Sequence, residues 1–135
     1  MQLRAIMDSS SNNIKTIMDT DTIYDAAELI FTAGAASVLI INKAKKSVGI
    51  ITEQEVVQAI KTYKQKILEL KTTHIMNIDL LACTPNEEVE EAVRVMSEYK
   101  IRNLPIITEG GNLAGFIDIN AVARAQLSNI IHKWG

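Results

Sequence analysis

The sequence predicts an α/β fold, classed as α+β in some schemes, in which two βαββα repeats pack with pseudo-twofold symmetry. Three observations predict it. Two short apolar stretches joined by a polar turn lie within Val38–Ile51, and a second such pair lies within Leu104–Ile117. Each pair runs directly into a helical pattern of apolar residues. The copies keep one offset, because Val38 and Leu104 are 66 positions apart, as are Gly49 and Gly115. A constant long period indicates an internal repeat.

The composition is typical of a globular protein and excludes several functional classes. Of the 135 residues, 47% are apolar and 22% are charged, while 4% are aromatic, so aliphatic side chains must build the core. A net charge of −2 without a basic run argues against a nucleic-acid partner. No apolar run approaches the roughly 20 residues of a membrane span, and the first residues do not resemble a signal peptide. The single cysteine excludes a disulfide framework, so we expect a cytoplasmic protein.

The elements of the first half follow in order from local signals. Leu3, Ile6 and Met7 form an apolar leader. The predicted elements are a strand at 14–17, a helix at 22–33 that Asp21 or Thr22 caps and Gly34 ends, strands at 37–42 and 48–51, and a helix from Thr52. We expect the charged stretch 61–71 to extend that last helix.

The second half repeats this order. The leader His74–Met76 echoes Ala5–Met7. We expect a strand over Leu80–Thr84, a helix over Glu87–Tyr99, two further strands, and a last helix over Asp118–His132. The repeats are assigned to residues 1–66 and 67–135. A lone βαββα unit has an apolar sheet face that it cannot bury by itself, which explains why two are present.

The repeat resembles the cystathionine-β-synthase (CBS) domain, and the tandem pair resembles a Bateman module. The residues that carry the resemblance are Ile101–Ile107, Gly115–Ile117, Gly49–Glu55 and His74–Met76. It covers nearly the whole chain and implies a stand-alone regulatory protein rather than an enzyme. It also implies that AMP, ADP, ATP or S-adenosylmethionine binds in the cleft between the repeats, with no cofactor required. The regulated partner, an enzyme or a transporter, is unknown.

The ligand motif of the family is a glycine, two apolar residues, Thr or Ser, two variable residues and Asp. The first repeat has Gly49, Thr52 and, in place of the Asp, Glu55. A carboxylate can accept from both hydroxyls of a ribose, and Thr52 at a helix N-terminus suits a phosphate. Thr-x-x-Glu is also simply a capping box, and that alternative remains open. The second repeat has Asp118 and Ala121 at these positions, so we expect one nucleotide site, in the first repeat.

Further residues are assigned to the site by position. Arg102 precedes a strand where the family often places a phosphate-binding group, and its fork of donors suits a phosphate. The alternatives for Arg102 are a solvated side chain or an ion pair with Glu98. The remaining proposed contacts are Ala36, which is equivalent to Arg102, and Ser37, Ile14 and Thr16.

The other candidates carry little chemistry. His74, His132 and Cys83 show no metal-ligand spacing, and Cys83 is expected in the core. No catalytic set is recognisable. The competing hypothesis is a ligand-free dimerisation or docking module. We expect a homodimer, because the helices have more apolar residues than a small core needs; these are Val56, Val57, Ile60, Val122, Ala123, Ile130, Ile131 and Trp134.

Overall fold

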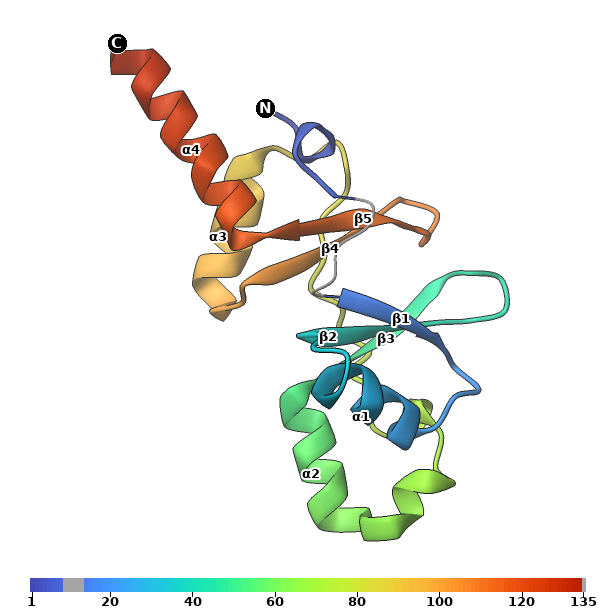
Figure 1. Cartoon of the computed structure of the whole chain (residues 1–135). Helices are drawn as coiled ribbons and strands as arrows, with labels where there is room; N and C mark the ends of the chain where they lie inside the picture. Colours follow the sequence, from blue (N-terminus) through green and yellow to red (C-terminus); the bar gives the residue numbers. More distant parts are fainter. Residues whose placement is uncertain (9–13, 135) are drawn as a thin grey trace. The chain divides into compact units, whose positions relative to one another are not determined.

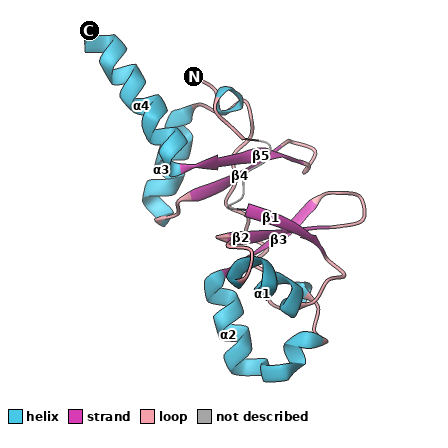
Figure 2. Ribbon diagram, viewed as in Figure 1, coloured by secondary structure: helices cyan, strands magenta, loops and turns pink. Residues whose placement is uncertain are grey.

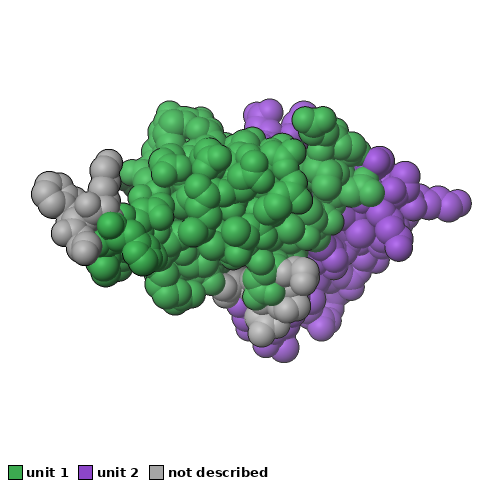
Figure 3. Space-filling model, turned by 90° about the horizontal axis from the view of Figure 1, so that it is seen from above, with its two compact units in different colours: residues 1–11, 81–135 green, residues 12–80 purple. Residues whose placement is uncertain are grey.

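The computed structural model describes residues 1–8 and 14–134, and its chain forms two compact units (Figure 3). Unit 1 combines Met1–Ser11 with Leu81–Gly135, and unit 2 is Asn12–Leu80. The units differ from a division after residue 66, because the two leaders are distributed differently. The leader before the first repeat belongs to the unit of the second repeat, whereas the leader before the second repeat belongs to the unit of the first.

Unit 2 is a three-stranded sheet with two helices on one face (Figures 1 and 2). Its elements are β1 (Ile14–Met18), α1 (Ile23–Phe31), β2 (Ser37–Ile41), β3 (Ser47–Thr52) and α2 (Glu53–Tyr63), followed by short 3₁₀ helices at Lys64–Leu68 and Thr72–His74. β2 is central, parallel to β1 and antiparallel to β3. Alternation along the strands turns Val38, Ile40 and Ile51 toward the helices, where they form one core with Ala26, Ile30 and Val56.

Unit 1 has the same plan with fewer strands. A 3₁₀ helix at Leu3–Ala5 is followed, after residue 80, by α3 (Val89–Tyr99), β4 (Asn103–Ile107), β5 (Leu113–Asp118) and α4 (Ile119–Trp134). β4 and β5 pair antiparallel. The core joins Leu104, Ile106 and Ile117 to α3 and α4 through residues such as Val95 and Val122.

The strand registers confirm the predicted repeat. Val38 pairs with Ile51, and Leu104 pairs with Ile117 at the equivalent position 66 residues later. A shift in the strand register also occurs at equivalent positions, between Ile40 and Ile41 in one hairpin and between Ile106 and Ile107 in the other. The predicted strands and the helix caps of the first repeat are also confirmed. Thr22 caps α1 through a reciprocal pair with Asp25, and Gly34 has a φ of 77° just beyond the end of the helix.

The strand predicted over Leu80–Thr84 is wrong, because this segment makes a single bridge to the described part of the chain, Cys83 with Ile106. The Cys83 N–H donates to the carbonyl of Pro105 (3.2 Å), and the Ile107 N–H donates to Cys83 (2.8 Å). The next bond on either side would need an N–H from Pro105 or from Pro85, and proline has none. At the position equivalent to Pro85, Asp19 donates to Ile41 at 2.9 Å. The two prolines thus limit the parallel ladder to a single bridge.

Two helix boundaries also differ from the sequence predictions. α2 ends at Tyr63 and does not extend to residue 71, because Lys64 has a φ of 52° and the chain continues as a 3₁₀ helix. α4 has no such break and continues to Trp134, five residues beyond the position equivalent to Tyr63. The helix predicted from Glu87 begins at Val89.

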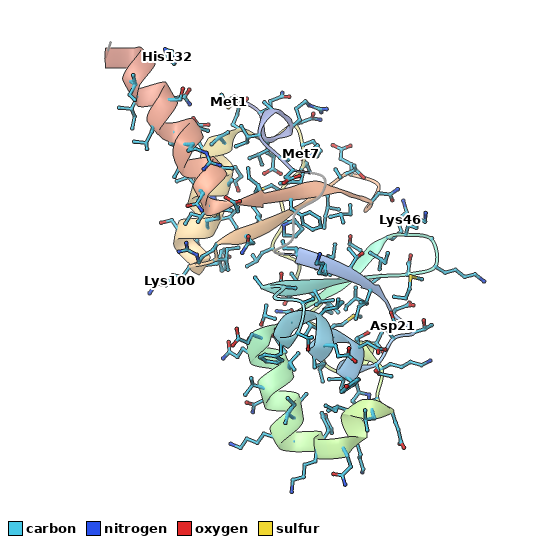
Figure 4. The ribbon with its side chains drawn as sticks, in the orientation of Figure 1. Met1, Met7, Asp21, Lys46, Lys100 and His132 are labelled. Atoms are coloured by element: carbon cyan, nitrogen blue, oxygen red, sulfur yellow. The ribbon has the colours of Figure 1, made fainter. Side chains whose placement is uncertain are left out.

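Each leader adds a further short pairing to the outer edge of a hairpin. Asn77 bridges to Ile50 in unit 2, and Asp8 bridges to Phe116 in unit 1. The hairpin glycines permit this approach. A Cβ on Gly49 would overlap the sulfur of Met76, and one on Gly115 would lie 3.0 Å from the carbonyl oxygen of Asp8. Met7, labelled in Figure 4, is the counterpart of Met76.

The apolar helix surface is smaller than the sequence suggested. Val56 and Val122 are buried in the unit cores, because they face the sheets. Val57, Ile60, Ile130 and Ile131 are exposed, by 44% to 66%. The side chain of Trp134 lies outside the described residues. Within the described chain, no helix combines the length and the apolar character that crossing a membrane requires.

Candidate functional site

Three predicted site residues form one row across the sheet of unit 2. Ser37 on β2 pairs with Ile14 on β1 and with Thr52 on β3. Residues in register point to the same side of a sheet, so the three side chains share the face opposite the helices. Ser37 and Ile14 are buried, and Thr52 is half-buried at the end of β3. The row therefore places the hydroxyls of Ser37 and Thr52 on neighbouring strands, at the point where β3 becomes α2.

Thr52 and Glu55 form the first turn of α2. Thr52 is the N-cap, with extended backbone (φ −106°), and the pair makes a capping box. Oε2 of Glu55 accepts from the N–H of Thr52 (3.2 Å) and also from its hydroxyl. Oε1 accepts no hydrogen bond among the described residues. One oxygen thus holds the helix start, while the other remains available to a donor.

The remaining predicted residues divide between the units. Ala36 is exposed just before Ser37, and Thr16 is exposed two residues after Ile14 on the same strand. Unit 2 therefore contains six of the seven candidates; five lie at the end of the sheet where β3 meets α2, and Thr16 lies at the middle of β1, paired with Leu39. Arg102 belongs to unit 1, where its carbonyl accepts from the N–H of Ile119 at 2.8 Å.

The ion pair between Arg102 and Glu98, one of the alternatives for this arginine, does not form. Glu98 instead pairs with Arg94 (2.5 Å), which also pairs with Glu91 (2.7 Å). These three residues are one to two turns apart along α3, so their side chains meet on the surface of the helix. The Arg102 guanidinium is exposed and makes no ion pair within the described part of the chain.

The equivalent turn in unit 1 has a different chemistry. Asp118 pairs in register with Asn103, and its Oδ1 accepts from the Ala121 N–H at 2.9 Å. The predicted N-cap is therefore confirmed. Ala121 offers no acceptor to a ribose, and a phosphate approaching this helix N-terminus would meet the carboxylate of Asp118, which repels it.

The sequence did not indicate that the leader of the second repeat lies beside the ligand motif. Asn77 exchanges backbone hydrogen bonds with Ile50 (2.8 and 2.9 Å), and Met76 lies over Gly49. Two features of the sequence could have indicated this packing. The two leaders are alike, and the second strand of each hairpin has a glycine at its centre.

The weaker candidates remain structural. Cys83 is buried, as expected of a core residue, and burial, with the nearby Glu87 carboxylate as the next cause, raises the pKa of its thiol to about 12. A thiol with so high a pKa is a poor nucleophile at neutral pH. Over residues 1–8 and 14–134, no three His, Cys, Asp or Glu side chains converge as metal ligands would.

The chain is similar to several curated proteins. It is 26% identical over 126 residues to an uncharacterized protein of Methanopyrus kandleri, covering 93% of this chain and 64% of that protein. It is 28% identical to a homoserine O-acetyltransferase of Methanosphaera stadtmanae, covering 95% of this chain but 24% of the enzyme. It is 24% identical to the CBS domain-containing protein YhcV of Bacillus subtilis, covering 94% and 89% of the two chains. The chain thus spans less than two thirds of the first two relatives.

Solved structures share the fold. The structure of CBSX2 of Arabidopsis thaliana in complex with AMP has a TM-score of 0.76 at 21% identity, covering 94% of this chain and 96% of that one. The CBS domain pair of protein MJ0100, in complex with 5′-methylthioadenosine and S-adenosyl-L-methionine, has a TM-score of 0.74 at 19% identity, covering 96% and 98%. The family model of the CBS domain matches residues 3–62 and 73–128. With both repeats matched in sequence and fold, the chain belongs to the CBS domain family.

Proposed function

We propose that this CBS pair is a regulatory module that binds an adenine nucleotide at the Thr52–Glu55 turn and thereby changes its engagement with a partner protein. The observation that carries the proposal is the available Oε1 of Glu55 beside the row of Ile14, Ser37 and Thr52. In this proposal the ribose hydroxyls donate to Glu55, while the helix N-terminus faces the phosphate. The chain regulates in this role and does not catalyse.

Two further observations support an adenine ligand. The CBS pairs of similar fold include one in complex with AMP and one in complex with S-adenosyl-L-methionine and 5′-methylthioadenosine. The Arg102 guanidinium, which makes no ion pair among the described residues, is the proposed phosphate ligand. ATP or ADP would extend the same phosphate contact.

Calorimetric titration with AMP, ADP, ATP and S-adenosylmethionine tests the site. We expect Glu55→Ala to weaken AMP binding roughly tenfold to a hundredfold, because it removes a charge-assisted hydrogen bond of about 1.5–3 kcal/mol. Asp118→Ala is the matched control at the other helix start, and we expect it to leave affinity unchanged or to raise it. Equal AMP affinity for Glu55→Ala and the parent would show that Thr52–Glu55 is only a helix cap.

The phosphate contact has its own test. Arg102→Ala is expected to weaken AMP at least tenfold but to leave adenosine nearly unchanged, because adenosine has no phosphate. The exposed neighbour Lys100, which has a φ of 55°, supplies the control. Asparagine tolerates that backbone conformation, so Lys100→Asn should leave the affinities for AMP and adenosine unchanged. An equal loss for AMP and adenosine would remove Arg102 from the phosphate site.

The second candidate function is a ligand-free dimerisation or docking module. The exposed apolar side chains of Val57, Ile60, Ile130 and Ile131 favour it, as does the capping role that already occupies one oxygen of Glu55. We expect a homodimer in either case, and light scattering at micromolar concentration measures it. If no adenine ligand changes the melting temperature even at millimolar concentration, docking becomes the better explanation. A monomer mass would contradict the dimer.

A further inference from the structure

Unit 1 contains a pocket that plays no part in the proposed nucleotide site. Its volume is about 380 Å³, and it is lined by Met1 and Ile6 from the N-terminal segment and by Ala121, Arg124 and Ala125 from α4. Both contributing segments belong to unit 1, and Figure 1 shows them in blue and red. Small-molecule sites commonly have about 300–1,000 Å³. The volume falls within this range, in a pocket that is open to solvent.

The side chains that line the pocket are apolar except for one guanidinium, and the N-terminal ammonium of Met1 is paired with the Glu88 carboxylate at 2.7 Å. Met1, Ile6, Ala121 and Ala125 offer only apolar side chains, and Arg124 offers the guanidinium. Arg124 makes no ion pair with any residue of the described chain. Residues 119–134 contain no Asp or Glu, so α4 itself supplies no competing carboxylate. A guanidinium without an ion-pair partner is suited to bind a carboxylate through two parallel hydrogen bonds.

Comparison with unit 2 shows what opens the pocket. Ala121 and Arg124 are equivalent to Glu55 and Gln58, 66 positions earlier. Unit 2 thus has a carboxylate where unit 1 has a methyl group, and a neutral amide where unit 1 has a cation. The start of α4 is also closed to an anion, because Asp118 caps it. The place for an anion in unit 1 is therefore one turn along the helix, at Arg124.

We propose that this pocket binds a small carboxylate with an apolar body, its charged end on Arg124 and its body against Ile6 and Ala125. The ligand needs no ribose, since position 121 has no acceptor. The site goes beyond the proposed nucleotide function and does not depend on it, because its lining includes none of the residues assigned to the nucleotide site.

Octanoate and octan-1-ol are suitable probes, because they share the apolar chain and differ in charge. Amide NMR of the full chain should show octanoate, at millimolar concentration, shifting signals of residues 1–8 and 119–125, with octan-1-ol binding at least tenfold more weakly. Arg124→Gln introduces the unit 2 residue at an exposed position and should weaken octanoate at least tenfold. Ala121→Glu should fill the pocket and abolish the shifts.

Gln58→Ala in unit 2 is the matched control and should leave octanoate binding unchanged. Equal affinities for octanoate and octan-1-ol, or an Arg124→Gln variant that binds octanoate as the parent does, would overturn the proposal. Shifts that are absent from residues 119–125 would overturn it as well. AMP titration of the same variants keeps the two sites distinguishable, because Arg124→Gln should bind AMP as tightly as the parent.

Discussion

The two repeats have the same strand register but begin their last helices with different chemistry. α2 starts with Thr52 bonded to Glu55, and α4 starts with Asp118 accepting from the Ala121 N–H. Both arrangements provide an N-terminal cap, which requires only an oxygen at the right place. Ligand recognition requires more, namely an acceptor that still has a lone pair to offer. The comparison teaches that the fold can keep the geometry of the helix start while the acceptor that the proposed nucleotide site requires is present in one copy and absent from the other.

The largest expected effect tests whether the two cores are equivalent. Ile40 and Ile106 occupy equivalent positions, and both are fully buried. We expect Ile40→Ala and Ile106→Ala each to lower the free energy of unfolding by about 2–5 kcal/mol, because each leaves a cavity. Urea unfolding measures the loss, and exposed Ile131→Ala is the control, with an effect of about 0.5 kcal/mol or less. A loss at one site less than half of that at the other would break the equivalence.

The next largest expected effect comes from substituting the two glycines on which the leaders pack. Gly49→Ala should cost about 1–3 kcal/mol, because its Cβ would overlap the sulfur of Met76. Gly115→Ala should cost less, since its closest neighbour is 3.0 Å away. The double variant Gly49→Ala with Met76→Ala should be more stable than the sum of the single losses predicts. Additive losses in thermal unfolding would mean that Met76 does not press on Gly49.

The two helix caps should prove interchangeable. Asp118→Ala should lower stability by about 0.5–2 kcal/mol, since the Ala121 N–H loses its acceptor. The combined change Asp118→Thr with Ala121→Glu places the unit 2 cap in unit 1 and should restore most of the loss, as measured by calorimetric melting. If the combined variant melts no higher than Asp118→Ala, the two caps are not equivalent.

The smallest expected effect is a gain in stability from a substitution in the second leader. Thr72 is fully buried, and its hydroxyl has no hydrogen-bond partner among residues 1–8 and 14–134. The equivalent leader residue, Leu3, is apolar and equally buried. Thr72→Val should therefore raise the free energy of unfolding by about 1 kcal/mol, because it removes an unsatisfied buried hydroxyl. Thr73→Val, at an exposed neighbour, should change little. A loss of stability for Thr72→Val would reveal a partner for the hydroxyl.

Much of the fold could be predicted, and its failures have local causes. The hairpins were predictable because apolar alternation and turn residues act over a few positions. The missing strand at Leu80–Thr84 was also readable in principle, since Pro85 and Pro105 remove the donors on either side of Cys83. The end of α2 was not readable, because Lys64 adopts a positive φ that its residue type does not suggest.

The candidate site was predicted as residues but not as an arrangement. The motif placed Thr52 and Glu55 in one helical turn, which spacing alone ensures. That Ile14 and Ser37 stand in the same row follows from the strand register. That one oxygen of Glu55 is used while the other is available follows from the rotamers of two side chains. Sequence spacing does not specify either feature.

By itself, the sequence determined the type and order of the elements, the repeat and the weakened second motif, because propensities, caps and hydrophobic periods are properties of short segments. The tertiary structure decided which leader packs on which repeat. The N–H of Leu3 donates to the carbonyl of Glu87 at 2.8 Å, although the two are far apart in the chain. It also decided that Val56 and Val122 are buried while Arg124 faces a pocket. Such outcomes depend on which surfaces fit when distant segments meet, and burial of apolar area makes that choice.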